Sequence, residues 1–205
     1  MSIINVNEIG PISLGSTVTV TAGSTLRLPT GSKVVGTDIG SVYAPGSVIQ
    51  VVQSVKADTY ATSFGAVWGD LPGLSVNITP RSSSNKILVL LDVKFIGDTD
   101  TSVSRIRLVR NSTEIYIGDA AGSRPRSSGA QNYTTSGGSG GFNVLASGGI
   151  YLDSPATTST LTYKVQGGGD SNSTIFYLNR TEGDRDTSYY DTRTASSITV
   201  MEISG

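Results

Sequence analysis

Alternation of apolar and polar residues runs from Val48 almost to the last residue of this chain. Apolar residues recur at every second position in short runs, and Gly, Ser, Thr and Pro separate the runs. A period of two places successive side chains on opposite faces of a β-strand, whereas an amphipathic helix needs a period of 3.6. No run keeps the helical period, so the pattern predicts an all-β body with almost no helix.

The predicted strands are residues 48–55, 74–79, 86–96, 103–109, 114–117, 143–152, 159–165, 174–178 and 197–203. Turn residues punctuate the intervals between them. About eight to ten short strands at this spacing are typical of two antiparallel sheets packed face to face, and among such folds a jelly roll fits best. We therefore expect an antiparallel β-sandwich of the jelly-roll type.

The composition removes most catalytic chemistry, because the chain has no His and no Cys. Imidazole and thiol are the commonest general base and the strongest nucleophile, and both are frequent metal ligands. Carboxylates remain at Asp98 and Asp100, and again at Glu182, Asp184 and Asp186. Both groups lie on predicted turns, where Asp is abundant for backbone reasons. We predict no enzymatic activity, no catalytic residue, no cofactor and no metal site, although a structural ion stays open.

Charge and hydropathy exclude further classes of partner. The net charge is −1 and only 15% of residues are charged, without a basic run. Nucleic-acid binding needs several Lys or Arg side chains facing phosphates, so none is expected. No apolar stretch approaches the length of a membrane helix, and the first ten residues lack the features of a secretory signal. We expect no membrane insertion and synthesis in a cytoplasm.

The first part of the chain, residues 1–43, differs from the rest. Its apolar residues come in pairs such as Val18 with Val20, set among glycines and too small to form a core. Two interpretations stay open: a flexible leader, or an attachment arm or trimeric stem stacked against copies from other chains. Pro45 and its following glycine mark a boundary. We therefore predict an arm over residues 1–43 and a sandwich over residues 44–205.

Leu88 and Leu90 occupy an unexpected phase of the strand predicted over residues 86–96. The core face of that strand holds Ile87, Val89 and Leu91, so the two leucines point the other way. An outward strand face normally carries polar residues. A covering loop would explain the leucines in a monomer. The alternative, which we adopt as the prediction, is burial against a neighbouring subunit of a homotrimer.

Two connections between strands are candidate recognition loops. Residues 119–141 form a long stretch rich in Gly and Ser, and connections of that length are usually functional or disordered. Residues 179–195 hold the densest cluster of charged and aromatic side chains. Tyr and Arg are favoured at binding hot spots, while a solvated loop with internal salt bridges is the plainer alternative. The candidate receptor-binding residues are Arg180, Asp184, Arg185, Asp186, Tyr189, Tyr190 and Arg193.

Four segments carry a resemblance to a known family. They are PGSVIQVVQ at residues 45–53, PGLSVNITP at 72–80, SSSNKILV at 82–89 and RTASSITVMEI at 193–203. Together they resemble virion structural or tail-fibre-like proteins of tailed phages, particularly phages of marine and cyanobacterial hosts. The resemblance covers residues 45–205, and its motifs are signatures of strands and turns.

The resemblance implies a virion protein made in the host cytoplasm: a homotrimeric fibre or tail-tip component that presents a jelly-roll head to the host surface. Its expected partners are a host glycan or protein and, through the N-terminal arm, other virion proteins. The alternative is a purely architectural part, such as an adaptor, head decoration or fibre segment, that touches only virion proteins. A depolymerase is a distant third, because such tailspikes generally need a long β-helix with an acidic groove.

Overall fold

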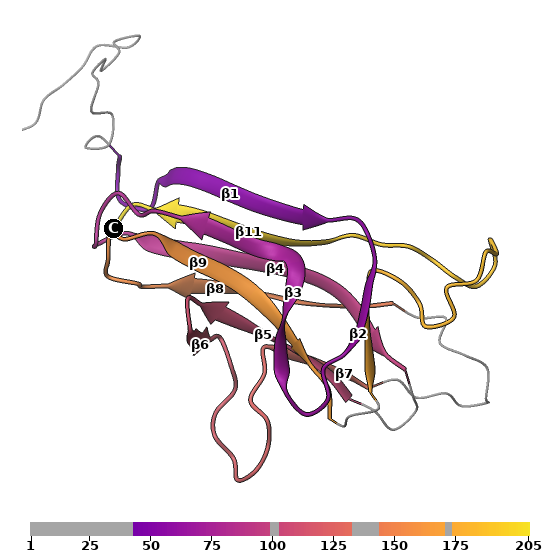
Figure 1. Cartoon of the computed structure of the whole chain (residues 1–205). Coiled ribbons are helices and arrows are strands. Elements are labelled where there is room, and N and C mark those ends of the chain that lie inside the picture. The colour runs from indigo at the N-terminus through magenta and orange to yellow at the C-terminus, as the bar shows by residue number, and fades with distance from the viewer. Residues whose placement is uncertain (1–42, 99–102, 133–143, 171–173) are drawn as a thin grey trace, which may run out of the picture. The chain divides into compact units, whose positions relative to one another are not determined.

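A computed structural model describes residues 43–98, 103–132, 144–170 and 174–205, and within them the regular elements are all β-strands (Figure 1). The strands are β1 (Val48–Lys56), β2 (Tyr60–Ser63), β3 (Trp68–Ile78), β4 (Lys86–Gly97), β5 (Val103–Arg110), β6 (Thr113–Ile115), β7 (Gly129–Asn132), β8 (Leu145–Asp153), β9 (Leu161–Gly168), β10 (Ile175–Leu178) and β11 (Ser196–Ile203). The expectation of an all-β domain is confirmed.

The strands form two antiparallel sheets, and three strand positions are each filled by two short strands. In sheet A, β8 pairs with one edge of β4, while β10 and β11 follow one another along the other edge. Beyond them, β2 pairs with β10 and β1 pairs with β11. In sheet B the order is β3, β9 and β5, with β6 and β7 sharing the outer edge of β5.

The order of these strands is that of a jelly roll. When each pair of short strands counts as one position, sheet A holds the first, eighth, third and sixth positions of the chain. Sheet B holds the second, seventh, fourth and fifth. Each sheet thus interleaves early and late strands, as the two Greek keys of a jelly roll require. The predicted jelly-roll sandwich is confirmed by the strand order of the chain itself.

The core lies between the inner faces of the two sheets. Alternate residues of β4 are buried and face this interior: Ile87, Val89, Leu91, Val93 and Phe95. Leu74, Val76 and Ile78 of β3 belong to the same buried cluster, as their alternation predicts. At one place the rings of Phe95 and Phe176 stack with centroids 4.9 Å apart. Burying one such side chain stabilises the fold by about 1.5–3 kcal/mol.

A buried polar group links the two sheets through this core. Asp153 of β8 accepts hydrogen bonds from Arg110 of β5 at 2.6 and 2.7 Å and from the Tyr163 hydroxyl of β9 at 2.6 Å. Burial, followed by the hydrogen bond to Asp153, raises the pKa of Tyr163, so its hydroxyl stays a donor. A buried carboxylate is tolerated when it is paired in this way.

The strand prediction misses β2 and β7 and begins β3 too late. The sequences YATS of β2 and GAQN of β7 are too short to show an apolar period, and Tyr60 is their one large apolar residue. Both strands form by pairing with β10 and β5. The first half of β3 contains Pro72, and its pairing with β9 shifts register between Asp70 and Ser75. Since Pro and Gly predict a turn, that half is hidden in the sequence.

The described chain begins and ends at the same end of the sandwich. A turn closes with Ser47 N donating to Ala44 O at 3.0 Å, and Gly46 takes the positive φ (85°) that this turn needs. Gly46 N also donates to Ser204 O at 2.8 Å, next to the C-terminus. The connection between β10 and β11 projects from the opposite end (Figure 1). The predicted arm lies outside the described residues except for Tyr43, so it stays a prediction.

Candidate functional site

The base of the 179–195 loop is fixed by one buried amide. Asn179 is fully buried and has a φ of 61°, a left-handed conformation that Asn tolerates better than most residues. Its Nδ2 donates to the carbonyl oxygens of Lys56 at 2.7 Å and Asp58 at 3.0 Å. Its Oδ1 accepts from Ser196 Oγ at 2.6 Å. The side chain thereby joins both ends of the loop to the segment after β1.

Within the loop, Asp184 holds two of the predicted arginines. Arg180 Nη1 donates to Asp184 Oδ2 at 2.7 Å, and Arg193 donates to both carboxylate oxygens at 2.7 and 2.9 Å. Arg180 and Arg193 also pair through an isolated β-bridge. Although partial desolvation opposes ionisation, the hydrogen bonds from Arg193 and Arg180 hold the pKa of Asp184 below its ordinary value. The Asp184 carboxylate therefore links Arg180 and Arg193, near the two ends of the loop.

Asp191 holds the third arginine. Arg185 donates to Asp191 Oδ2 from its Nε at 2.7 Å and from its backbone N at 3.1 Å, and the Thr181 hydroxyl donates to Oδ1. The hydrogen bonds from Arg185, then from Thr181, lower the pKa of Asp191 to about 2. Asp191 was not among the predicted site residues. Only its place in the charge cluster could have drawn attention to it.

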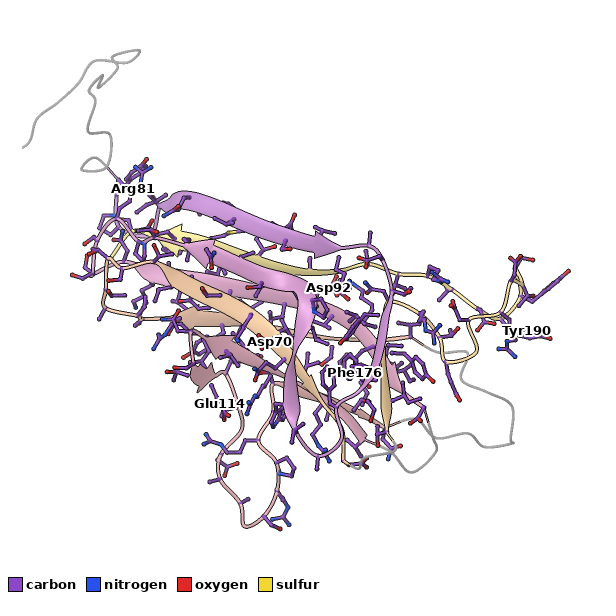
Figure 2. All side chains as sticks on the ribbon, in the orientation of Figure 1. Asp70, Arg81, Asp92, Glu114, Phe176 and Tyr190 are labelled. Atoms are coloured by element: carbon purple, nitrogen blue, oxygen red, sulfur yellow. The ribbon has the colours of Figure 1, made fainter. Side chains whose placement is uncertain are left out.

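The structure brings the predicted receptor-binding residues together in one loop. It differs from the prediction in which of them are available to a ligand. The guanidinium groups of Arg180, Arg185 and Arg193 pair with aspartates of the same loop, as the plainer alternative anticipates. The tyrosines stand out instead: Tyr189 is 86% exposed and Tyr190 is 57% exposed, with ring centroids 6.3 Å apart. Figure 2 shows Tyr190 toward the far end of the projecting loop.

A polar hollow of about 390 Å³ lies within this loop. Its lining consists of Asp184, Arg185, Asp186, Thr187, Asp191, Thr192 and Arg193. Most of these carboxylates and guanidinium groups already bind one another, so the hollow is built from satisfied ion pairs. The loop can therefore offer two aromatic surfaces on a base braced by hydrogen bonds.

A second candidate surface is the outer face of sheet A, where Leu88 and Leu90 point away from the core. Leu88 lies opposite Leu152 of β8 on one side and Met201 of β11 on the other. Met201 in turn lies opposite Val51 of β1. The register therefore places four apolar side chains in a row across four strands.

The neighbouring row adds two more apolar residues, because Leu90 lies opposite Ile150. Several of these side chains are well exposed: Ile150 is 68% exposed, Val51 54% and Leu152 47%. We call this surface the apolar outer face. Its members are Val51, Leu88, Leu90, Ile150, Leu152 and Met201.

The outer face of sheet B is polar by contrast. Asp70 binds Lys164 at 2.7 Å, and Arg107 binds Gln166 at 2.8 Å and also pairs with Glu114. Asp70 and Glu114 are labelled in Figure 2. A solvated antiparallel sheet face normally looks like this one. The apolar outer face of sheet A departs from that norm.

Sequence reasoning identified only the two leucines of the apolar outer face. Val51, Met201, Ile150 and Leu152 were missed, although they occupy the outward phase of their own strands. Trp68, by contrast, belongs to the polar sheet: Arg107 lies over its ring at 4.5 Å. It packs as a surface residue of sheet B.

The remaining carboxylates singled out in the sequence include Asp98 and Asp100. Asp100 lies outside the described residues. Among those that the structure describes, no three His, Cys, Asp or Glu side chains gather as metal ligands. In the same part of the chain, no helix is long and apolar enough to cross a membrane.

Comparisons with known proteins give similarities to solved structures alone. No protein-family model matches the sequence, and no match is found among curated proteins. One similar structure is that of the infectious bursal disease virus Gt strain, at 12% identity and a TM-score of 0.40, covering 84% of this chain and 47% of that one. Another is the VP2 subviral particle of the same virus, at 12% identity and a TM-score of 0.34, covering 86% and 49%.

This chain therefore spans less than half the length of these viral chains. At TM-scores below 0.5 the similarities add nothing to the assignment of the fold, which the chain's own strand order makes.

Proposed function

We propose that this chain is a non-enzymatic structural protein of a phage virion, a tail-fibre or tail-tip component that displays its jelly roll for attachment to the host surface. The observation that carries the proposal is the 179–195 loop, a hydrogen-bonded projection with Tyr189 and Tyr190 exposed on it. The resemblance of residues 45–205 to tail-fibre-like proteins supports the same role.

The two ends of the sandwich suit such a display. The described chain enters beside the C-terminus, where Gly46 binds Ser204, and the 179–195 loop projects at the other end (Figure 1). A protein held to the virion through residues 1–43 would therefore point this loop outward. Recognition commonly resides in loops held by a rigid scaffold. Tyr189 and Tyr190 offer flat rings for stacking on sugar faces or for burial in a receptor.

Homotrimer formation through the apolar outer face is part of the proposal. The face combines Leu88 and Leu90 with exposed neighbours such as Ile150, and large apolar patches usually mark interaction surfaces. We assign its occupant to sister copies of the same chain, because the fibre resemblance implies a trimer. Burial of this face between copies would take the apolar side chains of sheet A out of water, and would leave the polar face of sheet B as the solvated one.

An architectural role is the second candidate, and one observation favours it. The guanidinium groups of the three arginines form ion pairs with Asp184 and Asp191, so less unpaired charge is left for a receptor. An adaptor or fibre segment that touches only virion proteins would need no free recognition loop. This role predicts no saturable adsorption to cells.

Adsorption of the purified, fluorescently labelled protein to a panel of marine cyanobacterial strains separates the two roles. The attachment role predicts saturable binding to at least one strain. Changing Tyr189 and Tyr190 together to Ala should weaken it by about tenfold or more, as expected for hot-spot aromatics. Because both side chains are exposed, the variant should keep its fold. The matched control is Val67→Ala, a truncation of another exposed side chain, which should bind as the wild type does.

Two results would favour the architectural role. One is the absence of saturable binding to every strain of the panel. The other is unchanged adsorption by a Tyr189→Ala, Tyr190→Ala protein whose mass and circular dichroism match those of the wild type.

A further inference from the structure

A second hollow, of about 530 Å³, opens where β8 lies beside the segments that follow β6 and precede β7. It is lined by Tyr116, Ile117, Gly118, Ser127, Ser128 and Tyr151. Its volume falls in the range of sites for small ligands, about 300–1,000 Å³. None of its lining residues belongs to the 179–195 loop, whereas Ser127 and Ser128 belong to the second candidate connection, residues 119–141.

The backbone of Tyr116 adopts an uncommon conformation that builds one wall. Its φ is 53°, in the left-handed region that bulky residues rarely occupy. Such a residue costs about 1–3 kcal/mol and persists only where its surroundings hold it. The strained turn lays the Tyr116 ring beside the Tyr151 ring, with centroids 5.4 Å apart and planes at 34°. Two phenol rings thus form one aromatic corner.

Gly149 of β8 makes room for this corner. A Cβ atom at Gly149 would lie only 2.3 Å from the Tyr116 hydroxyl oxygen. Any other residue would therefore push the Tyr116 ring from its present position. The glycine of β8 and the strained tyrosine just after β6 are complementary features from segments far apart in sequence.

Hydrogen bonds brace the loop that carries this wall. Ser128 Oγ donates to the Tyr116 carbonyl at 2.8 Å and accepts from Leu108 N at 2.9 Å. Arg126 Nε donates to the Gly118 carbonyl at 2.6 Å. The wall is thus held in place without a ligand, and a site formed in advance loses less entropy on binding.

The chemistry of the lining selects the class of ligand. It presents two aromatic rings, the hydroxyl groups of tyrosine and serine, and backbone groups, and it contains no charged side chain. A neutral sugar ring matches this set: its C–H face packs on an aromatic ring while its hydroxyl groups exchange hydrogen bonds with phenol and serine. A charged ligand would lose hydration without gaining a counter-charge.

We propose that this hollow binds a neutral pyranose unit of a saccharide, with Tyr116 and Tyr151 as the stacking surface. The proposal goes beyond surface attachment through the 179–195 loop and does not depend on it. Binding to an isolated sugar is a property of the purified protein, whatever cell or virion component carries that sugar.

Saturation-transfer NMR on the full chain tests the proposal. The probes are the methyl glycosides of glucose, galactose, mannose and N-acetylglucosamine, with glucuronic and sialic acids as charged counterparts. At least one neutral glycoside should bind saturably, and Tyr151→Ala should weaken its binding by about tenfold or more. Gly149→Ala keeps both tyrosines in the sequence but displaces the Tyr116 ring, so it should weaken the binding as well. The matched control, Val67→Ala, truncates an exposed side chain outside both candidate sites and should bind as the wild type does.

Several outcomes would overturn the proposal. They are the absence of saturable binding to every neutral glycoside, a preference for the charged sugars, and binding that survives both Tyr151→Ala and Gly149→Ala. If circular dichroism shows that Tyr151→Ala does not fold, Gly149→Ala and Ser127→Ala replace it as the test. Both should weaken the binding of the neutral glycoside, and binding that survives both would overturn the proposal. Sugar binding by a protein that does not adsorb to cells would uphold this site while contradicting the attachment role.

Discussion

Asn179 connects the packing of the sandwich to the geometry of the 179–195 loop. It combines a left-handed φ with full burial, and its amide satisfies two carbonyl groups and one hydroxyl. Few residues can meet both demands, because most side chains disfavour this backbone conformation and lack an amide. The residue thus ties both ends of the 179–195 loop to the segment at the end of β1.

Replacing Asn179 with Ala should lower the free energy of unfolding by about 3 kcal/mol. The variant removes the donor of a buried hydrogen bond to the Lys56 carbonyl and of a partly buried one to the Asp58 carbonyl, and an unsatisfied buried group costs about 1–3 kcal/mol. Urea denaturation measures the loss. Asn77→Ala, on an exposed strand position, is the matched control and should change stability by less than about 0.5 kcal/mol. Equal stabilities of the two variants would contradict the anchoring role.

Asp191 makes the loop sensitive to acid. Hydrogen bonds, first from Arg185, hold its pKa at about 2 in the folded chain, against an ordinary value of 3.8. Folding favours the ionised form, so this stabilisation is complete above the ordinary pKa and is lost as the pH falls toward 2. The protection of the loop amides, that is their hydrogen exchange relative to the unstructured chain at the same pH, should therefore be constant down to pH 4 and should fall between pH 4 and 2.

The Asp191→Asn variant supplies the test of that cause. In this variant the amides of residues 179–195 should already lose their protection from hydrogen exchange at neutral pH. The reason is that a neutral amide binds the Arg185 guanidinium more weakly than a carboxylate does. Asp186→Asn, at an exposed neighbouring carboxylate, should behave like the wild type. Slow exchange at neutral pH in Asp191→Asn would show that other contacts order the loop.

At the scale of elements, the two sheets differ in what they turn outward. Strand β4 carries apolar residues on both faces, and its outward leucines continue into β8 and β11. Strands β3, β5 and β9 carry ion pairs and amides on their outward face. The difference predicts which sheet is covered in an assembly.

Changing Leu88 and Leu90 together to Glu should dissociate the assembly and leave the β content largely intact. Two carboxylates buried in an interface would lose their hydration without a partner, whereas in a monomer they would face water. Light scattering reports the mass and circular dichroism the fold. The matched control is Ser75→Glu with Asn77→Glu, on the outer face of sheet B, which should keep the wild-type mass. A Leu88→Glu, Leu90→Glu protein that keeps that mass would place the interface elsewhere.

The sequence predicts the strands that have a strong apolar period and misses those formed by pairing alone. The alternation of residues 86–96 is enough to identify β4 and to separate its two faces. Strands β2 and β7 have no such period. They form because their neighbours β10 and β5 supply the hydrogen bonds. Only the strand order of the finished sheets shows that short strands share a position.

The candidate sites follow the same division. The composition of residues 179–195 indicates the loop, yet the choice of partners within it depends on geometry. Asp184, which has a φ of 43°, pairs with both Arg180 and Arg193, and no pattern in the sequence indicates that choice of partners. The aromatic corner of Tyr116 and Tyr151 is equally hidden, since it depends on a positive φ after β6 and on a glycine in β8.

At the scale of the whole molecule, the jelly roll has two different ends and two different faces. The chain enters beside its C-terminus, the 179–195 loop projects from the other end, and one outer face is apolar. An attached, self-associating display protein uses each of these features: one end for anchoring, one face for sister copies, one end for contact. A freely diffusing monomer would leave the apolar outer face exposed to water.

The mass of the full chain in solution tests this account most directly. Light scattering coupled to size-exclusion chromatography should give three times the 21.3 kDa of one chain, independent of concentration over the micromolar range. A trimer would support burial of the apolar outer face between copies. A mass of 21.3 kDa at every concentration would contradict the account, because Leu88, Leu90 and their neighbours would then have no sister chain to cover them.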